Sequence, residues 1–176
     1  MTRILLISGS TRSASTNSAL VRTAAAFPPD GIEPTLYAGL ADLPHFNPDD
    51  DADPLPSTVA SLRSAIAYAD AVLICTPEYA GTLPGSMKNL LDWTVGGTEM
   101  TDKPVAWVNA AADSRRGGGA HATLATVLGY VQARVVVEAC ADVPVSRDAI
   151  GADGLISDER IRADIRAALT TFATLS

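Results

Sequence analysis

Residues 2–27, TRILLISGSTRSASTNSALVRTAAAF, decide the fold. The run Thr2–Ser8 is short, apolar and uninterrupted, which is typical of a parallel strand buried on both faces. It stops at Gly9-Ser10, and a loop rich in hydroxyl groups follows. A polar residue at one of positions 15–17 can then cap a helix that reaches about Phe27, where Pro28-Pro29 ends it. The stretch therefore predicts a strand, a tight turn and a helix in direct succession.

The same alternation continues along the chain. Further strands are predicted at Thr35–Tyr37, Ala71–Cys75, Pro104–Val108 and Val135–Val137. Further helices are predicted at Ser57–Ala69 with Ser57 as N-cap, Ser86–Thr94, His121–Val131 and Asp158–Leu175 with Ser157 as N-cap. Strands that alternate with helices imply right-handed crossovers and a parallel sheet covered on both faces. We therefore predict a single α/β domain over residues 1–176, with three layers and a five-stranded parallel sheet.

Composition excludes several classes of function. The chain has 176 residues, 47% of them hydrophobic, which is enough for one compact domain. Its net charge of -7 argues against a nucleic-acid partner and against binding to anionic membranes. No apolar run is long enough to span a bilayer, and the sequence starts directly with a strand, so we expect a cytoplasmic protein. Cys75 and Cys140 lie in apolar, strand-like runs and are expected to be free thiols. Together with two unrelated histidines they predict no metal site.

Ligands of open α/β sheets bind at the carboxyl ends of the strands, so the loops after the first, third and fourth strands are the places to search. The first of these, Gly9–Asn17, offers hydroxyl groups, Arg12 and the free N–H groups of a helix N-terminus. Converging donors and a cation are what a phosphate group needs. The loop thus indicates a phosphate site, and an ordinary capped turn is the alternative.

Three other classes do not fit this loop. It contains neither the G-x-x-x-x-G-K pattern of an NTPase nor the G-x-G-x-x-G pattern of a dinucleotide-binding fold. The first strand ends in Ser8 instead of the Asp of a phospho-receiver. The chain also has no G-x-S-x-G elbow, which argues against the common hydrolase type.

Residues 76–93, TPEYAGTLPGSMKNLLDW, are the most specific stretch of the chain. Together with the loop at 9–17 they resemble the NADPH-dependent FMN reductase family, whose patterns are close to G-S-x-R-x-x-S-x-N and P-E-Y-N-x-x-x-P-G-x-x-K-N-x-x-D-W. Residues 43–47 and 69–74 extend the resemblance over most of the chain. It implies a flavodoxin-like fold with strand order 2-1-3-4-5. It also implies an oxidoreductase that passes electrons from NADPH or NADH through bound FMN to a quinone, free flavin, azo dye or chromate.

The resemblance assigns roles to matching residues. The FMN phosphate and ribityl chain would lie against Ser10, Arg12, Ser15, Thr16, Asn17 and Ser18. The isoalloxazine ring would be lined, largely through backbone groups, by Pro77, Glu78, Tyr79, Ala80 and Gly81. A structural role, in fixing the helix that supports the second loop, falls to Lys88, Asn89, Asp92 and Trp93. No catalytic side chain is required, and His45 is only a weak candidate for a proton donor, while His121 is expected to be structural.

The sequence departs from the family pattern at two places. Ala80 stands where the family has Asn, which removes a side-chain amide from the flavin environment. The third loop, residues 109–117, reads NAAADSRRG and lacks the usual G-A-S-P-G start. Its pair Arg115-Arg116 is a candidate for contact with the phosphate of NADPH or with a partner subunit, and two solvated arginines are the alternative.

The resemblance also implies a homodimer or homotetramer, and the expected interface residues are Leu43–Phe46, Trp93 and Met100. Two alternatives to the reductase stay open. One is a flavodoxin-like electron carrier or FMN-binding sensor without catalytic activity. The other is a family member that has lost its flavin.

Overall fold

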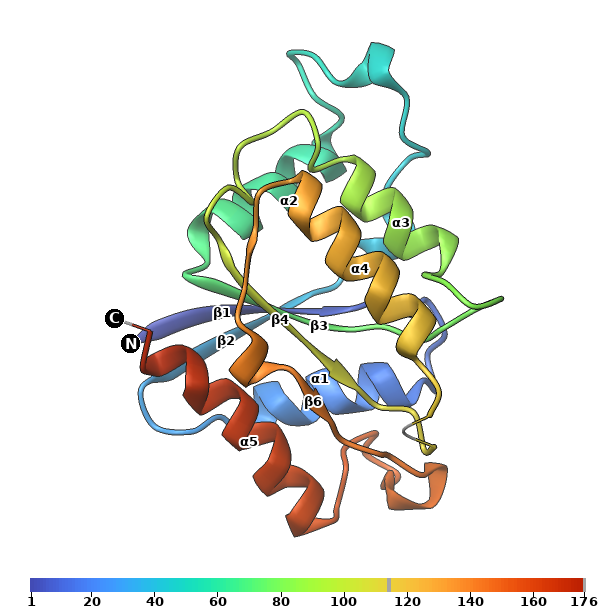
Figure 1. The fold of residues 1–176 in the computed structure, drawn as a ribbon, viewed down its shortest axis with the longest axis vertical. Helices are drawn as coiled ribbons and strands as arrows, with labels where there is room; N and C mark the ends of the chain where they lie inside the picture. Colours follow the sequence, from blue (N-terminus) through green and yellow to red (C-terminus); the bar gives the residue numbers. More distant parts are fainter. Residues whose placement is uncertain (114, 176) are drawn as a thin grey trace.

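The computed structural model describes residues 1–113 and 115–175, and it contains a parallel sheet with helices on both faces (Figure 1). The strands are β1 Thr2–Ser8, β2 Ile32–Tyr37, β3 Ala71–Cys75, β4 Pro104–Asn109, β5 Arg134–Val135 and β6 Ala141–Asp142. The α-helices are α1 Thr16–Ala26, α2 Ser57–Tyr68, α3 Gly85–Asp92, α4 Gly118–Tyr130 and α5 Glu159–Ala173. Short 3-10 turns are η1 Leu40–Asp42, η2 Pro48–Asp50, η3 Val137–Ala139 and η4 Arg147–Ala149.

The strand order β2-β1-β3-β4-β5 confirms the predicted flavodoxin-like topology. β1 lies between β2 and β3 and pairs in parallel with both. Its apolar residues are buried and alternate between two cores. Ile4 and Leu6 belong to the core beneath α1 and α5, whereas Leu5 and Ile7 belong to the core beneath α2, α3 and α4 (Figure 1). The uninterrupted apolar run of β1 is explained by this burial on both faces.

Among the described residues the sheet has six strands instead of the predicted five, because the last position is divided between two short strands. β5 pairs with β4 at Val105, and β6 pairs with β4 at Val108 and Asn109. Between them, Val137 begins the turn η3 instead of ending a strand. This turn places Ala139 in the core that α5 also covers, so tertiary packing overrides the strand preference of the valine run.

Several helix ends differ from the prediction. Pro56, not Ser57, precedes the first residue of α2. Asp158 caps α5, because its carboxylate accepts the N–H groups of two residues in the first turn, and Ser157 stands outside the helix. α4 begins at Gly118, ahead of the predicted His121. Glycine disfavours helix interiors, so the sequence alone places this start too late.

Both cysteines are free thiols, as predicted. Cys75 is fully buried in β3, and its S–H donates to Oδ1 of Asn17 (3.2 Å). Burial raises the pKa of the Cys75 thiol, which keeps it in the unreactive protonated form. Cys140 is half-buried and follows η3, so it does not lie in a strand as the sequence suggested.

Three residues that were expected at a subunit interface lie in the core instead. Leu43, Trp93 and Met100 are buried within the chain, in the cluster beneath α2, α3 and α4. The Trp93 indole N–H donates to the Pro44 carbonyl (2.8 Å), and the ring packs edge-on against Phe46. The polar loop between β2 and α2 thus packs on Trp93, and the three buried side chains are not available to a partner.

Candidate functional site

Two of the three candidate loops touch directly at the carboxyl ends of β1 and β3. The N–H of Gly9 donates to the Cys75 carbonyl (2.8 Å). A Cβ atom at Gly9 would lie 2.2 Å from Oγ1 of Thr76, so no larger residue fits without a shift of Thr76. Glycine at this position therefore lets the first and second loops meet.

The first loop exposes a set of unpaired donors at the N-terminus of α1. Ser15 is the N-cap of α1, and its hydroxyl accepts the N–H of Asn17 (3.2 Å). In this loop, which the structure describes in full, no acceptor is found for the backbone N–H groups of Thr11, Ser13, Ala14, Ser15 and Thr16. Free donors and the positive end of a helix dipole suit a phosphate group. The loop thus fits the phosphate end of FMN.

Some of the predicted phosphate ligands already have structural partners. The Ser18 hydroxyl lies 2.9 Å from that of Ser8, and Asn17 accepts the Cys75 thiol. Ser10 accepts the N–H of Arg12 at 3.3 Å. These side chains order the loop, whereas the guanidinium of Arg12 has no partner among residues 1–113 and 115–175.

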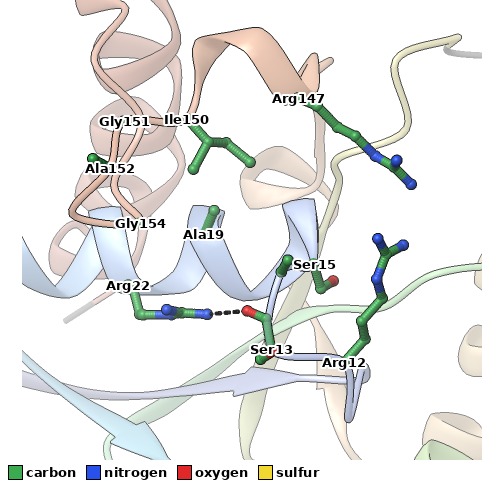
Figure 2. Close-up of a pocket in the computed structure, with 11 residues that line it drawn as sticks. Arg12, Ser13, Ser15, Ala19, Arg22, Arg147, Ile150, Gly151, Ala152 and Gly154 are labelled. Carbon is green, nitrogen blue, oxygen red and sulfur yellow. Dashed lines mark hydrogen bonds between the residues drawn. The ribbon is translucent and has the colours of Figure 1, made fainter.

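Arg22 is a residue of the site that the sequence reasoning missed. From the second turn of α1 it reaches back and donates to the carbonyls of Ser13 (2.8 Å) and Ser18 (3.2 Å). It helps to enclose a pocket of about 390 Å³ beside the loop (Figure 2). The pocket is lined by Arg12, Ser13, Ala14, Ser15, Ala19, Arg22, Arg147, Ile150, Gly151, Ala152 and Gly154.

The second loop contains a tight hairpin. Tyr79 and Thr82 exchange two backbone hydrogen bonds, of 3.0 and 3.1 Å. The two residues between them, Ala80 and Gly81, have positive φ angles of 52° and 79°. This is the pattern of a type I′ turn, in which Asn-Gly is the preferred pair. The Tyr79 ring is 56% exposed, so it is not a packed core aromatic.

Replacing Ala80 with asparagine is expected to raise the free energy of unfolding by about 0.5–1 kcal/mol, because asparagine adopts the left-handed conformation more readily than alanine. Urea unfolding of the apoprotein measures this change. Ala80→Gly relieves the same backbone cost without adding an amide. If only Ala80→Asn also tightens FMN binding, the amide contacts the flavin, and a loss of stability in Ala80→Asn would contradict the turn assignment.

Glu78 attaches the second loop to the start of α4. One of its carboxylate oxygens accepts the N–H groups of Gly119 (2.8 Å) and Ala120 (3.2 Å). A Cβ atom at Gly119 would lie 2.1 Å from the Gly81 carbonyl oxygen, so the hairpin and the helix are in close contact. A carboxylate at a helix N-terminus is favourable for the unpaired N–H groups and for the helix dipole. The Glu78 side chain is therefore a remote cap of α4, and its backbone remains free to line a ring.

Asn109 at the end of β4 organises the third loop. Its amide donates to the Arg116 carbonyl (2.8 Å) and to the Asp142 carboxylate (2.8 Å). The expected arginine pair is divided, because Arg115 forms an ion pair with Asp113 (2.9 Å) while Arg116 borders a cleft of about 340 Å³. Ser114 of this loop lies outside the described residues.

That cleft joins all three loops. Its lining consists of Thr16, Asn17, Thr76, Pro77, Glu78, Asn109, Ala111, Arg116 and Gly117. It runs from the N-terminus of α1 to the second loop, so one elongated ligand can reach from the phosphate donors to the ring-lining segment. The unpaired donors at the start of α1 and the lining of the cleft by all three loops fit FMN.

The two histidines lie apart from this cleft. His45 is exposed and lines none of the hollows described above, so its role as a proton donor stays a prediction. His121 stacks on Trp107 with ring centroids 5.7 Å apart. Burial lowers the pKa of His121, and Asp142 and Glu78 act against that shift. In the part of the chain that the structure describes, no group of three or more His, Cys, Asp or Glu residues is placed to hold a metal ion.

The fold and the three loops define a flavodoxin-like, FMN-binding oxidoreductase. The chain belongs to the NADPH-dependent FMN reductase family, whose model matches residues 2–145. It is 32% identical over 162 residues to an NAD(P)H-dependent FMN reductase of Pseudomonas aeruginosa, an alignment that covers 91% of this chain and 87% of the relative. The chain is accordingly an FMN-dependent enzyme that takes electrons from NAD(P)H.

Two further relatives bear on the acceptor and the fold. A quinone reductase of Escherichia coli K12 is 33% identical over 105 residues, which is 59% of this chain and 54% of that protein. Among solved structures, FerB, a flavoenzyme NAD(P)H:(acceptor) oxidoreductase from Paracoccus denitrificans, superposes with a TM-score of 0.77. It is 28% identical, and the match covers 98% of both chains.

Proposed function

We propose that this enzyme reduces a small molecule of the quinone, free flavin, azo dye or chromate kind. The observation that carries the proposal is the cleft that connects the phosphate donors of the first loop to the second loop. Relatives named as quinone reductases and as an NADPH azoreductase support acceptors of this kind. When bound, FMN supplies the hydride acceptance and electron transfer that no side chain can provide.

The residues of this chain would bind and orient the cofactor. We propose that the phosphate and ribityl chain lie against Ser10, Arg12, Ser15, Thr16, Asn17 and Ser18. The ring would lie along the segment Pro77, Glu78, Tyr79, Ala80 and Gly81. Since Glu78 fixes this segment to α4, its backbone groups can hold the ring in one position. We keep His45 as a weak candidate for proton delivery.

We further propose one FMN-binding domain over residues 1–176 that assembles as a homodimer or homotetramer in the cytoplasm. The outer face of α4 is the proposed interface, because Leu43, Trp93 and Met100 are buried within the chain. Its exposed residues are uncharged and mostly small, namely Gly118, Ala122, Ala125, Thr126, Gly129 and Tyr130. Light scattering that gives the mass of a monomer would contradict the oligomer.

None of the helices in residues 1–113 and 115–175 is long and apolar enough to cross a bilayer.

The first experiment is a visible spectrum of the purified protein, saturated with FMN and freed of excess. We expect bound flavin, and we expect it to bleach when NADPH is added without air. Steady-state NADPH oxidation with a quinone then measures turnover. Flavin that stays yellow would support an electron carrier or sensor instead, and no bound flavin would mean that Ala80 and the altered third loop have abolished cofactor binding.

A further inference from the structure

A second arginine lies opposite the first loop. Arg147 begins the turn η4, which follows β6 near the end of the chain. Figure 2 shows the guanidinium groups of Arg12 and Arg147 pointing toward the same space, next to Ser15 at the N-terminus of α1. Both line the pocket of about 390 Å³ that Arg22 helps to enclose.

Neither of these two guanidinium groups has a partner in the part of the chain that the structure describes. Leaving aside positions 114 and 176, no hydrogen bond or ion pair is formed by the side chain of Arg12 or Arg147. Four other arginines do form ion pairs with carboxylates, namely Arg3, Arg63, Arg115 and Arg162. The protein has a net charge of -7, so carboxylates that could pair with arginines are plentiful. Arg12 and Arg147 nevertheless face one another, and two unpaired cations in this position repel. Such an arrangement is favourable when an anion lies between them.

The segment that carries Arg147 is held firmly against α1. The N–H of Ile156 donates to the Thr23 hydroxyl of α1 (2.9 Å). The N–H of Ser157 donates to the Ala149 carbonyl (3.0 Å), which closes the loop at its base. The same helix therefore sets the position of the first loop and of Arg147, so the two arginines approach one another from a rigid support.

The pocket between them suits a phosphate attached to an organic group. Its charged end contains both guanidinium groups and the free N–H groups of Ser13 and Ala14. Beyond them the lining becomes apolar, with Ala19 and Ile150. Planar guanidinium groups bind phosphate oxygens in pairs, and two of them match the double negative charge of a phosphate monoester.

We propose that Arg147 and Arg12 together bind a phosphate monoester at the N-terminus of α1. Arg147 lies beyond residue 145, where the match to the family model ends, so the segment after β6 adds a ligand contact of its own. Two molecules of the proposed reaction carry such a group, FMN at its 5′-phosphate and NADPH at its 2′-phosphate. The choice of FMN and NADPH as the candidate ligands rests on the proposed function.

The test compares ligands with and without the phosphate on the variant Arg147→Gln. FMN and riboflavin are titrated into the apoprotein, and flavin fluorescence is followed. Adenosine 2′-monophosphate and adenosine are titrated by calorimetry. Loss of one charge-assisted contact is expected to weaken one phosphate ligand by about 10- to 100-fold and to leave the ligand without phosphate unchanged. A weaker FMN identifies the flavin phosphate, whereas a weaker adenosine 2′-monophosphate identifies NADPH.

Arg166→Gln is the matched control, because Arg166 is exposed on α5 and its side chain forms no bond in the described structure. It makes the same change in net charge and should alter neither affinity. Arg12→Gln combined with Arg147→Gln should lose less than the sum of the two single changes, since both act on one phosphate. If Arg147→Gln leaves both phosphate ligands unchanged, the proposal is wrong. A wild-type protein that binds no flavin would refute the proposed function alone, since the calorimetric titration still tests the arginine pair.

Discussion

Replacing Trp93 with alanine is expected to lower the free energy of unfolding by about 3–5 kcal/mol. The Trp93 ring is fully buried at the end of α3, and no solvent reaches it. Its removal would leave a large cavity in the core beneath α2, α3 and α4. It would also remove the donor to the Pro44 carbonyl and the edge-on contact with Phe46. Urea unfolding, followed by far-UV circular dichroism, measures the loss.

Trp93→Phe separates the two contributions. Phenylalanine keeps most of the apolar volume but cannot donate, so we expect it to cost about 1–2 kcal/mol. A stability equal to that of the wild type in Trp93→Ala would contradict the packing described here. Flavin titration gives a second measurement, the affinity for the cofactor. In Trp93→Ala the loop between β2 and α2 would lose an anchor, while the phosphate loop at residues 9–17 keeps its own contacts. Riboflavin and FMN affinities should therefore change together.

The motif residues around Trp93 also fix the loop between β2 and α2. Asn89 accepts the N–H of Phe46 (2.8 Å) and donates to the Pro44 carbonyl (2.9 Å). Arg63 donates to the Trp93 carbonyl and forms an ion pair with Asp51 (2.7 Å). These bonds hold a long polar loop that has no regular strand or α-helix. The supporting role that the resemblance implied for Asn89 and Trp93 thus has a physical basis in this loop.

The sequence predicted the features that depend on neighbouring residues. β1 and β3 begin and end where the apolar runs Thr2–Ser8 and Ala71–Cys75 do. Ser15 caps α1 as one of the three candidates named for that role. Burial on both faces leaves a clear signal, because every position of such a strand must be apolar.

Features that depend on distant partners were not predictable. The start of α4 at two glycines is stabilised by Glu78, which lies some forty residues earlier in the chain, so local propensity could not locate it. Arg147 stands in an ordinary polar stretch, and only the folding of its segment onto α1 brings it to Arg12. Trp93 reads as an exposed apolar residue because the loop that packs on it has no periodic pattern.

Replacing Glu78 with alanine is expected to lower the free energy of unfolding by about 2–3 kcal/mol, because two N–H groups of α4 lose a charged acceptor. The loss of FMN affinity should be larger than the loss of stability suggests. Without the carboxylate, the hairpin keeps the hydroxyl contact between Thr82 and Thr123 (2.9 Å) and the close approach of Gly81 to Gly119, which are weaker attachments to α4. Urea unfolding and flavin titration measure the two effects.

Glu78→Gln is the matched control for this change. Glutamine keeps an acceptor oxygen at the same distance along the side chain and removes only the charge, so it should recover most of the stability and retain flavin binding. Because the ring would be lined by backbone groups, the affinities for FMN and riboflavin should fall by the same factor in Glu78→Ala. A loss confined to FMN would place the damage at the phosphate loop, and full flavin affinity in Glu78→Ala would show that the hairpin does not depend on this cap. If Arg147→Gln weakens FMN but not riboflavin, the comparison of the two variants distinguishes the phosphate end of the flavin site from its ring end.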